Sequence, residues 1–328
     1  MRSHILPEQE YKEKMNQTVV PYLLERKKEI RYEREKGNII YCACYAADDA
    51  KGIVLISHGF TETAEKYLES IYYFLQEGYH VYCMEHCGHG QSYRMTEDLS
   101  LIHVDRYERY VDDLLFVAKA AKEKWRGLPL MLYGHSMGGG IGAAAAAKEP
   151  DYFSKVVLSS PMIRPVTKPV PWAMAKLIAQ ICCTIGREKN YIIGQKPYSG
   201  EEKFEESSSV SRARFEYYQE KRIAIPEFHM NAASYSWLRS AGKMNGYLQR
   251  EGWRHLVMPI LVLQADGDTL VSNREMERFV NKVSRHGNIR MVKIYHTKHE
   301  IFNAEETTLK GYWEKIFAFL DATCDDRG

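Results

Sequence analysis

The chain has 328 residues, 45% of them hydrophobic, and 45 Lys and Arg stand against 43 Asp and Glu. This length is enough for one large domain, or for a domain with an insertion, and for the buried core of an enzyme. The formal net charge of only +2 provides no strong field for nucleic acid or for an anionic membrane, so we expect no nucleic-acid partner.

The first residues, MRSHILPEQEYKEKMNQ, lack an apolar core of signal-peptide length and carry acidic side chains unlike a transit peptide. The seven cysteines are an odd number without regular disulfide spacing. The most apolar long segment, VPWAMAKLIAQICCTIG, is interrupted by Lys176 and is shorter than the ~20 residues that span a bilayer. These features predict a cytoplasmic protein without a transmembrane helix.

In chain order, residues 1–37 are expected to form a charged helical arm, broken at Pro21, on the surface of the domain. Short apolar runs typical of buried strands follow, and they alternate with helical patterns such as RYERYVDDLLFVAKAAKEKWRG. The runs are NIIYCACYA, GIVLISH, HVYCMEH, LPLMLYGH, KVVLSSP, MPILVLQAD and IRMVKIYH. This alternation predicts an α/β protein with a doubly wound, mainly parallel sheet.

The alternation stops between Pro161 and about Met258, where Pro-rich, Ser- and Glu-rich and aromatic stretches follow one another. Because the strand pattern resumes at MPILVLQ, we interpret this stretch as an insertion. The predicted organisation is therefore an arm (1–37), an α/β core (38–160 and 259–328) and a helical cap (161–258).

The segment GHSMG matches the nucleophile-elbow pattern, with Gly134 and Gly138 on either side of Ser136. Roughly one unrelated chain in ten of this length would contain the pattern by chance. Here a predicted strand precedes it and a helix of almost bare backbone follows it, as a tight strand-to-helix turn requires. A phosphate-binding loop is the alternative, but no P-loop Lys follows and the GxGxxG spacing is absent.

A serine becomes a strong nucleophile when a histidine takes its proton and an acid orients that histidine. In hydrolases with this elbow the acid and then the histidine follow the serine along the chain. Asp266 and Asp268 follow one late strand, and His296 and His299 follow the last. The residues alone leave both pairs open.

Two backbone amides are candidates for the oxyanion hole, those of Phe60 after an early strand and of Met137 after the serine. A second cluster resembles metal ligands: Cys83, His86, Cys87 and His89. Its spacing is not a standard zinc pattern. We favour a tight loop with both histidines at the surface over a metal site.

The sequence resembles the α/β-hydrolase superfamily, and within it the lysophospholipases and monoacylglycerol lipases often labelled serine aminopeptidase-like. The resemblance runs from about residue 50 to the C-terminus and rests on the segments SHGFTETAEKY, EHCGHGQS, YVDDL, GHSMGG, SSPM, SYSWLRSA, LVLQADGDTLVSNREMERF and YHTKHEIFNAEE. It implies an α/β-hydrolase fold of about eight strands with a helical cap.

Position by position, the resemblance implies Ser136 as nucleophile, Asp268 as acid and His299 as base. It places Phe60 at the oxyanion position and Glu62 as a brace for that loop. The chain departs from the family where DxRGxGxS is usual: Glu85 replaces the Asp, and His86–Cys87 replaces the basic residue. The ion pairing of this loop is therefore in question.

The implied reaction is hydrolysis of an acyl ester through an acyl-enzyme on Ser136, and it requires no metal and no organic cofactor. The expected substrate is a single-chain lipid, either a lysophospholipid or a monoacylglycerol. The alternatives are a small-molecule or aryl esterase, peptide hydrolysis, for which no amine-binding feature is visible, and a non-catalytic ligand-binding protein on this scaffold.

We expect the cap to line the acyl site, although packing of a cap helix on the core explains the same apolar spacing. The candidate substrate contacts are Met162, Trp172, Met174 and Leu177, with Ile178 and Ile181 in the same pattern. An apolar cap edge is also expected to touch a bilayer or micelle peripherally. Arg212, Arg214, Tyr217 and Tyr218 are candidates for contact with a phosphate headgroup.

Overall fold

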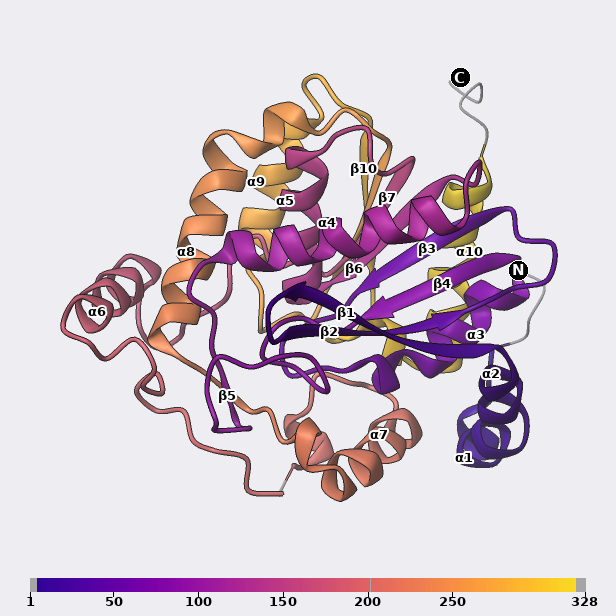
Figure 1. The fold of residues 1–328 in the computed structure, drawn as a ribbon, viewed down its shortest axis with the longest axis horizontal. Helices are drawn as coiled ribbons and strands as arrows, with labels where there is room; N and C mark the ends of the chain where they lie inside the picture. The colour runs from indigo at the N-terminus through magenta and orange to yellow at the C-terminus, as the bar shows by residue number, and fades with distance from the viewer. Residues whose placement is uncertain (1–4, 201, 323–328) are drawn as a thin grey trace.

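The computed structural model describes residues 5–200 and 202–322, so the extreme ends of the predicted arm and core lie outside the described residues. The chain forms an eight-stranded sheet in the order β1-β2-β4-β3-β6-β7-β9-β10 (Figure 1). β1, β2 and β4 pair antiparallel, and the other neighbours pair parallel. The strands are β1 (Lys27–Glu35), β2 (Asn38–Tyr45), β3 (Gly52–Ser57), β4 (Tyr79–Met84), β6 (Leu130–His135), β7 (Lys155–Ser159), β9 (Ile260–Ala265) and β10 (Ile289–Ile294). The predicted mainly parallel sheet is confirmed.

The central strands are continuous apolar runs because both faces of the sheet are covered. In β3, Ile53 and Leu55 belong to one hydrophobic cluster, and Val54 and Ile56 belong to the cluster on the opposite face. A strand buried on both sides has no polar face, so it lacks the alternation of a half-exposed strand.

Helices cover the two faces of the sheet (Figure 1). On one face lie α3 (Leu68–Gln76) and α10 (Glu306–Asp321), whose buried residues share a cluster. On the other face lie α4 (Tyr107–Lys124), α5 (Ser136–Lys148) and α9 (Asn273–Val283). Among the described residues, no helix has both the length and the apolar character needed to cross a bilayer.

The N-terminal segment differs from the predicted broken helix. Helical turns continue through α1 (Tyr11–Lys14), a π-helical turn and α2 (Val20–Arg26), with Pro21 in the first turn of α2, where a proline is tolerated. Residues 27–35 then form the edge strand β1 instead of helix. Ile30 and Tyr32 pack inward against the core between charged, outward-facing neighbours, which is typical of an edge strand.

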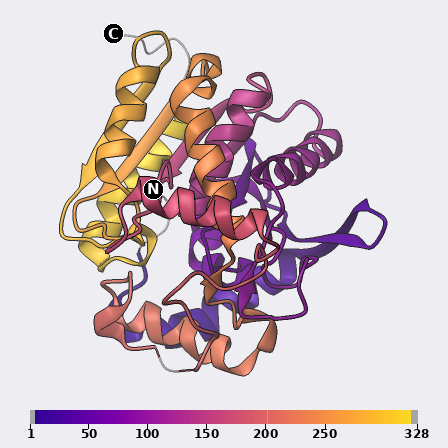
Figure 2. The same cartoon turned by 90° about the vertical axis from the view of Figure 1, so that its left-hand side faces the viewer.

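Between β7 and β9 the described residues form three α-helices outside the sheet layers: α6 (Trp172–Thr184), α7 (Arg212–Ala224) and α8 (Tyr235–Arg250). In Figures 1 and 2, α7 lies at the lower edge of the molecule, and α6 projects from one side in Figure 1. A small parallel pair, β5 (Leu101–Ile102) with β8 (Ala232–Ala233), joins this segment to the loop after β4.

Helix α7 is anchored by Arg214, whose side chain is fully buried. Its guanidinium donates to both carboxylate oxygens of Glu69 on α3, at 2.9 and 2.7 Å, and to Glu8 at 3.0 Å. Glu8 also accepts the backbone N–H of Ala213 in the first turn of α7. Arg214 is therefore used inside the protein, and the expectation that it meets a substrate headgroup is wrong.

Helix α5 packs so closely on the sheet that there is no room for a side chain where its first turns face the sheet. A Cβ at Gly138 would lie 2.0 Å from the carbonyl oxygen of Ser57, and one at Gly134 would lie 2.8 Å from that of Gly138. Both obstacles are backbone atoms, which have no rotamer to change. The glycines of the predicted elbow are therefore steric requirements of the fold.

We predict that Gly138→Ala strongly destabilises the protein, because the new methyl group overlaps the β3 carbonyl. The matched control is Gly246→Ala in α8, where a Cβ meets no atom within 4 Å. The control is expected to stabilise by roughly 0.5–1 kcal/mol, the helix-propensity difference between Gly and Ala. Thermal unfolding measures both, and a Gly138→Ala protein as stable as its parent would contradict this account of the elbow.

Candidate functional site

Ser136 lies at the junction of β6 and α5, where the chain turns sharply. Its φ of 52° is unusual for a residue with a side chain, and the residue is almost completely buried. Holding a residue with a side chain in this left-handed backbone conformation costs about 1–3 kcal/mol. Such a conformation persists only where the surrounding structure enforces it. The turn thus has the strained geometry of a nucleophile elbow.

His299 and Asp268 contact each other directly. The Nδ1 of His299 lies 2.7 Å from Oδ2 of Asp268, and both side chains are buried. Oδ1 of Asp268 accepts the backbone N–H groups of Leu270 and Val271 at 2.8 and 3.0 Å. Burial alone would raise the pKa of Asp268, but the hydrogen bond and charge of His299 and these two amides hold it below its ordinary value.

The other two candidates, Asp266 as the acid and His296 as the base, meet at the turn after β10. Asp266 accepts the backbone N–H groups of His296 and Thr297 at 3.1 and 3.2 Å, and so braces the turn after β10. His296 is exposed, with a φ of 59° in that turn. By contrast, the ring of His299 lies 4.9 Å from the ring of His135, the residue before Ser136. The structure therefore brings Asp268 and His299, and not Asp266 and His296, together beside the elbow.

The predicted oxyanion loop after β3 is held by Glu62. Its Oε2 accepts the backbone N–H of Gly59 at 2.5 Å and the hydroxyl of Tyr67 at 2.6 Å. The carboxylate thus fixes the backbone directly before Phe60, whose ring lies 4.6 Å from the ring of Trp237 on α8. Glu62 makes the bracing contacts that the family resemblance implies.

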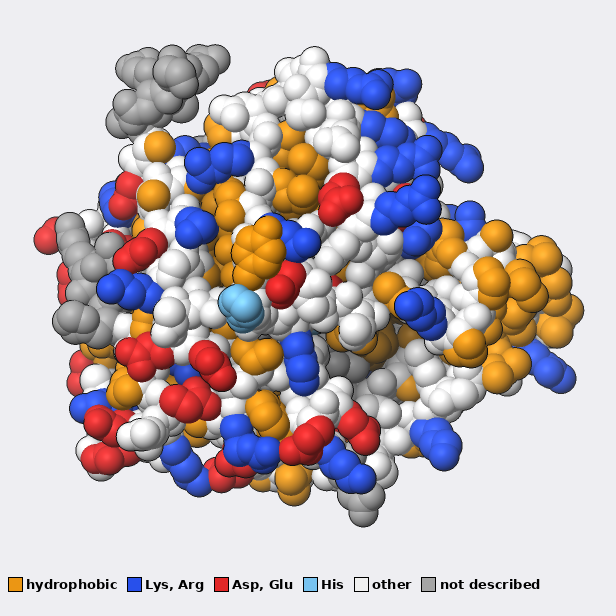
Figure 3. Space-filling view, turned by 180° about the vertical axis from the view of Figure 1, so that it is seen from behind, with side chains coloured by type: hydrophobic (Ala, Val, Ile, Leu, Met, Phe, Trp, Pro, Cys, Tyr) orange, Lys and Arg blue, Asp and Glu red, His pale blue; other side chains and the backbone are white. Residues whose placement is uncertain are grey.

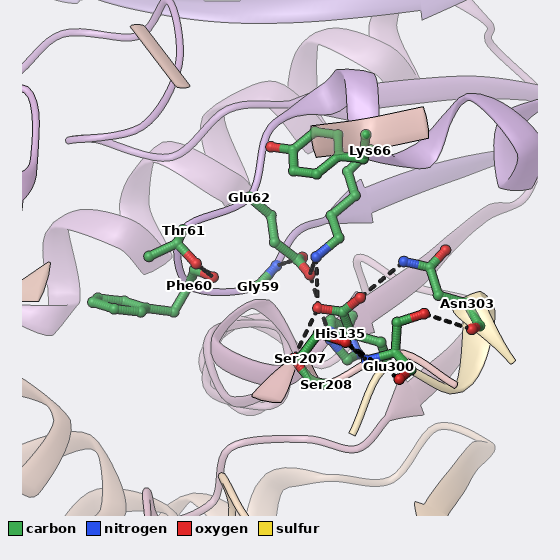
Figure 4. A network of polar contacts seen from close by, with 12 residues as sticks. Gly59, Phe60, Thr61, Glu62, Lys66, His135, Ser207, Ser208, Glu300 and Asn303 are labelled. Carbon is green, nitrogen blue, oxygen red and sulfur yellow. Dashed lines mark hydrogen bonds and ion pairs between the residues drawn. The ribbon is translucent and has the colours of Figure 1, made fainter. Parts of the chain in front are cut away.

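Lys66 connects this loop to the loop that carries His299 (Figure 4). Its ammonium lies 3.2 Å from Oε1 of Glu62 and donates to Oε1 of Glu300 at 2.6 Å. Glu300 in turn accepts Ser208 Oγ at 3.0 Å and Asn303 Nδ2 at 2.8 Å. A single buried ion-pair cluster therefore joins the loops after β3 and β10 to the segment before α7.

The charges of this cluster depend on one another. Burial alone would raise the pKa of Glu62, yet Lys66 and its other neighbours lower it to about 2. Burial alone would lower the pKa of Lys66, yet the two carboxylates, Glu300 first, raise it above the ordinary lysine value. His135 also faces Glu62, but burial dominates and lowers its pKa to about 4, so the imidazole is neutral at pH 7.

Sequence reasoning missed Lys66 and Glu300. The available signals were weak: Glu62 and Lys66 are four residues apart, and Glu300 directly follows the candidate base. Neither spacing indicates that Glu62 and Glu300, more than 200 residues apart in the sequence, both contact the ammonium of Lys66. Pairing of this kind depends on the tertiary fold.

The loop after β4 also differs from expectation. His86 and His89 are completely buried instead of lying at the surface, and with His58 they form a cluster of rings with centroids 4.7 to 6.5 Å apart. Burial lowers the pKa of His58 to about 4 and those of His86 and His89 well below the ordinary value. Over residues 5–200 and 202–322, no three His, Cys, Asp or Glu side chains are arranged to hold a metal ion.

Glu85, the departure from the family pattern, joins two loops. Its carboxylate accepts the backbone N–H groups of Ala64 at 3.0 Å and Gln91 at 2.6 Å. Burial raises its pKa to about 7. The loop is therefore held by a carboxylate bonded to backbone amides, which answers the question about its ion pairing.

The four expected substrate contacts have different surroundings. Met162 is buried, and its backbone N–H donates to the carbonyl of Ser136 at 2.7 Å. Trp172 is half-buried against the core cluster. Met174 and Leu177 lie on the exposed side of α6, which Figure 3 shows as an apolar lobe at the edge of the molecule, outside the buried surroundings of Ser136. These two residues are therefore left out of the acyl site proposed below.

The structure has the features of an α/β-hydrolase: the order of the sheet, a strained serine after β6, an acidic residue after β9 and a histidine after β10. The family model described as Hydrolase_4: Serine aminopeptidase, S33 matches residues 48–306. The chain therefore belongs to this family of hydrolases.

Relatives support this assignment at modest identity. The chain is 23% identical to the probable lysophospholipase L2 of Haemophilus influenzae over 274 residues, 82% of this chain and 83% of that protein. It is 32% identical to the monoacylglycerol lipase of Mycolicibacterium smegmatis over 145 residues, 44% of this chain and 50% of that protein.

Solved structures agree in fold. The monoglyceride lipase of Saccharomyces cerevisiae, solved with a substrate analog, has a TM-score of 0.73 at 18% identity, covering 90% of this chain and 95% of that one. A carboxyl esterase of Bacillus coagulans reaches 0.75 at 18% identity, covering 90% and 98%. At these identities the likeness concerns the fold alone.

We predict that Lys66→Met lowers the free energy of unfolding by about 3–5 kcal/mol, because Glu62 and Glu300 are left buried without their cation. Lys66→Arg keeps the charge and should retain most of the stability. The matched control is Lys119→Met on α4, whose side chain is 64% exposed, with an expected change within about 0.5 kcal/mol. Urea unfolding measures all three, and equal values for Lys66→Met and Lys119→Met would contradict the proposed dependence on Lys66.

Proposed function

We propose that this protein is a serine carboxylic-ester hydrolase with Ser136 as nucleophile, His299 as base and Asp268 as acid. The observation that carries the proposal is the 2.7 Å hydrogen bond between His299 and Asp268 beside a serine held at a φ of 52°. Strain at Ser136 and burial of an oriented imidazole are expected where a hydroxyl must be activated.

In the first step, Ser136 Oγ attacks the ester carbonyl carbon while its proton passes to His299 Nε2. Nε2 is the nitrogen available for this, because Nδ1 faces Asp268. The carbonyl oxygen becomes an oxyanion and accepts the backbone N–H groups of Phe60 and Met137. The bond between the acyl carbon and the alcohol oxygen then breaks, and His299 returns the proton to the departing alcohol.

In the second step, water attacks the acyl carbon of the acyl-enzyme and gives its proton to His299. The bond to Ser136 Oγ breaks, Oγ recovers the proton, and a carboxylic acid leaves. Asp268 stays ionised throughout and stabilises the imidazolium, in keeping with its lowered pKa. The residues so named complete the reaction without a cofactor.

We infer that the substrate is a single-chain lipid ester, a lysophospholipid or a monoacylglycerol, with residues 161–258 as a cap over the serine. The names of the relatives support this class. Buried Met162 and half-buried Trp172, at the start of this segment, are the apolar candidates for the acyl chain. Such a substrate resides in bilayers or micelles, so peripheral contact with a lipid surface belongs to the proposal.

A fluorophosphonate probe tests the catalytic assignment, since it forms a covalent bond only with an activated serine. We predict that the parent protein is labelled and that Ser136→Ala is not. Asp268→Asn should lower kcat by about a thousandfold or more, because the imidazole loses its orienting acceptor. Asp266→Asn is the control and should retain most of the activity, because the hydrogen bonds of Asp266 go to the backbone of His296 and Thr297 and not to the imidazole of His299.

A folded parent protein that resists the probe would contradict the proposal. It would favour the rival view of a non-catalytic ligand-binding protein on the hydrolase scaffold.

A panel of esters tests the substrate class. We predict that kcat/KM increases with acyl chain length across p-nitrophenyl esters, because each methylene transferred to an apolar site contributes up to ~0.8 kcal/mol. Lysophosphatidylcholine, lysophosphatidylethanolamine and monoacylglycerol then separate the headgroups. Highest activity on the shortest acyl groups would instead indicate a small-molecule or aryl esterase.

A further inference from the structure

The end of strand β3 carries a histidine that belongs neither to the candidate triad nor to the Lys66 cluster. His58 directly follows β3 and is completely buried. Its Nε2 lies 2.9 Å from the backbone nitrogen of His86, and its Nδ1 lies 2.8 Å from the carbonyl oxygen of Gly59. Both ring nitrogens are therefore occupied by backbone groups, which leaves neither of them for proton transfer to a substrate.

These two partners determine where the imidazole carries its proton. A backbone N–H can only donate, so Nε2 of His58 accepts from His86. A carbonyl oxygen can only accept, so Nδ1 holds the proton and donates it to Gly59. Burial also lowers the pKa of His58 to about 4, so the ring is neutral at pH 7, as this tautomer requires.

The hydrogen bond to Gly59 acts on the peptide that contains the candidate oxyanion donor. A trans peptide is planar, and its C=O and N–H groups point in opposite directions. Holding the carbonyl of Gly59 therefore fixes the direction of the Phe60 N–H on the other side of the same plane. Among residues 5–200 and 202–322, no atom accepts a hydrogen bond from this N–H, so it is available to an oxyanion.

The two adjoining peptides are held by other side chains (Figure 4). Glu62 accepts the N–H of Gly59 at 2.5 Å, which fixes the preceding peptide. The hydroxyl of Thr61 donates to the carbonyl oxygen of Phe60 at 2.6 Å, which fixes the following one. Thr61 has a φ of 61°, a rare conformation for a residue branched at Cβ. Three side chains thus hold three successive peptides, and His58 holds the one that carries the Phe60 N–H.

This stretch of backbone packs against the elbow. A Cβ at Gly59 would lie 3.1 Å from Cδ2 of His135, the residue before Ser136. A Cβ at Gly138 would lie 2.4 Å from the carbonyl oxygen of His58. The loop after β3 therefore touches the residues on both sides of the candidate nucleophile.

His58 is itself held by the loop after β4. The centroid of its ring lies 4.7 Å from that of His86 and 5.0 Å from that of His89. The Nε2 of His86 also lies 2.9 Å from Oγ of Ser57, the last residue of β3. The backbone and the side chain of His86 therefore tie the ends of β3 and β4 together around the ring of His58.

From these contacts we propose that His58 is a positioning residue, which aims the Phe60 amide at the oxyanion by holding the carbonyl of Gly59. The inference rests on the proposed ester hydrolysis at Ser136, since it concerns the charge that develops there. The Phe60 amide contributes most in the transition state, when the ester carbonyl oxygen becomes negative. Loss of the Nδ1 donor therefore lowers kcat and has little effect on KM.

Two substitutions separate the roles of the two ring nitrogens. His58→Asn keeps an N–H near the position of Nδ1 and loses the acceptor for His86, whereas His58→Gln keeps an acceptor near the position of Nε2 and loses the donor to Gly59. With a p-nitrophenyl ester, we expect His58→Asn to keep kcat within about threefold and His58→Gln to lower it by about tenfold or more. Each variant loses one buried hydrogen bond, so both should unfold at similar urea concentrations.

An inhibitor reports on the oxyanion itself. A trifluoromethyl ketone forms a tetrahedral adduct with an activated serine, and the oxygen of that adduct is negative. We expect its Ki to rise with His58→Gln by about the factor by which kcat/KM falls, and to stay near the parent value with His58→Asn.

His80→Gln is the matched control. His80 is buried at the start of β4, at the opposite end of the strand from the oxyanion loop, and its Nδ1 accepts the N–H of Ala47 at 3.0 Å. This variant also loses one buried hydrogen bond of a histidine Nδ1, so its stability should fall to a similar extent while its kcat stays at the parent value.

Two results would overturn the proposal: equal kcat for His58→Asn and His58→Gln, or a fall in kcat for His80→Gln as large as that for His58→Gln. If neither His58 variant folds, the nitrogen NMR shifts of the parent decide, because a proton on Nε2 of His58 would contradict the proposed tautomer. Fluorophosphonate labelling reports separately on hydrolysis. A labelled, active parent with an equally active His58→Gln variant removes only the role of His58, whereas a parent that is neither labelled nor active removes both proposals.

Discussion

The arrangement of the site depends on one buried positive charge, which needs negatively charged partners because water cannot reach it. The ammonium of Lys66 is buried between the carboxylates of Glu62 and Glu300. An unpaired buried charge costs several kcal/mol, so each partner holds the others in place. Through Glu62 the cluster holds the loop before Phe60, and through Glu300 it holds the residue next to His299. The same interaction therefore positions both the loop after β3 and the loop after β10.

The second constraint is the absence of side chains where α5 meets the sheet. With a Cβ at Gly138 the helix could not approach the end of β3, and the turn that presents Ser136 would open. The ends of β3, β6, β9 and β10 lie at one edge of the sheet because these strands run parallel. The carboxyl ends of parallel strands are where α/β folds gather their sites.

The segment between β7 and β9 is attached to the rest of the protein in two different ways. Before α7 it is tied to the cluster through Ser208 and Glu300, and α7 itself is tied to α3 through Arg214. In contrast, α6 rests on α8 through alanines and turns its Leu and Ile outward. One part of the segment is therefore firmly joined to the core, and another presents its apolar residues to the surroundings.

The sequence by itself determined the order of buried strands, the mainly parallel sheet and the elbow, because each is encoded in local periodicity or in a short motif. It narrowed the acid and the base to two candidates each, since strand ends are visible in the pattern of residues. The family resemblance favoured Asp268 over Asp266 and His299 over His296, but only the tertiary structure shows Asp268 and His299 in contact, because that contact depends on which side chains meet across 31 residues of chain. Tertiary packing likewise decided the edge strand β1, the burial of the histidines, the Lys66 cluster and the exposed apolar side of α6. Local sequence records which residues are apolar or charged, and the fold determines which of them meet.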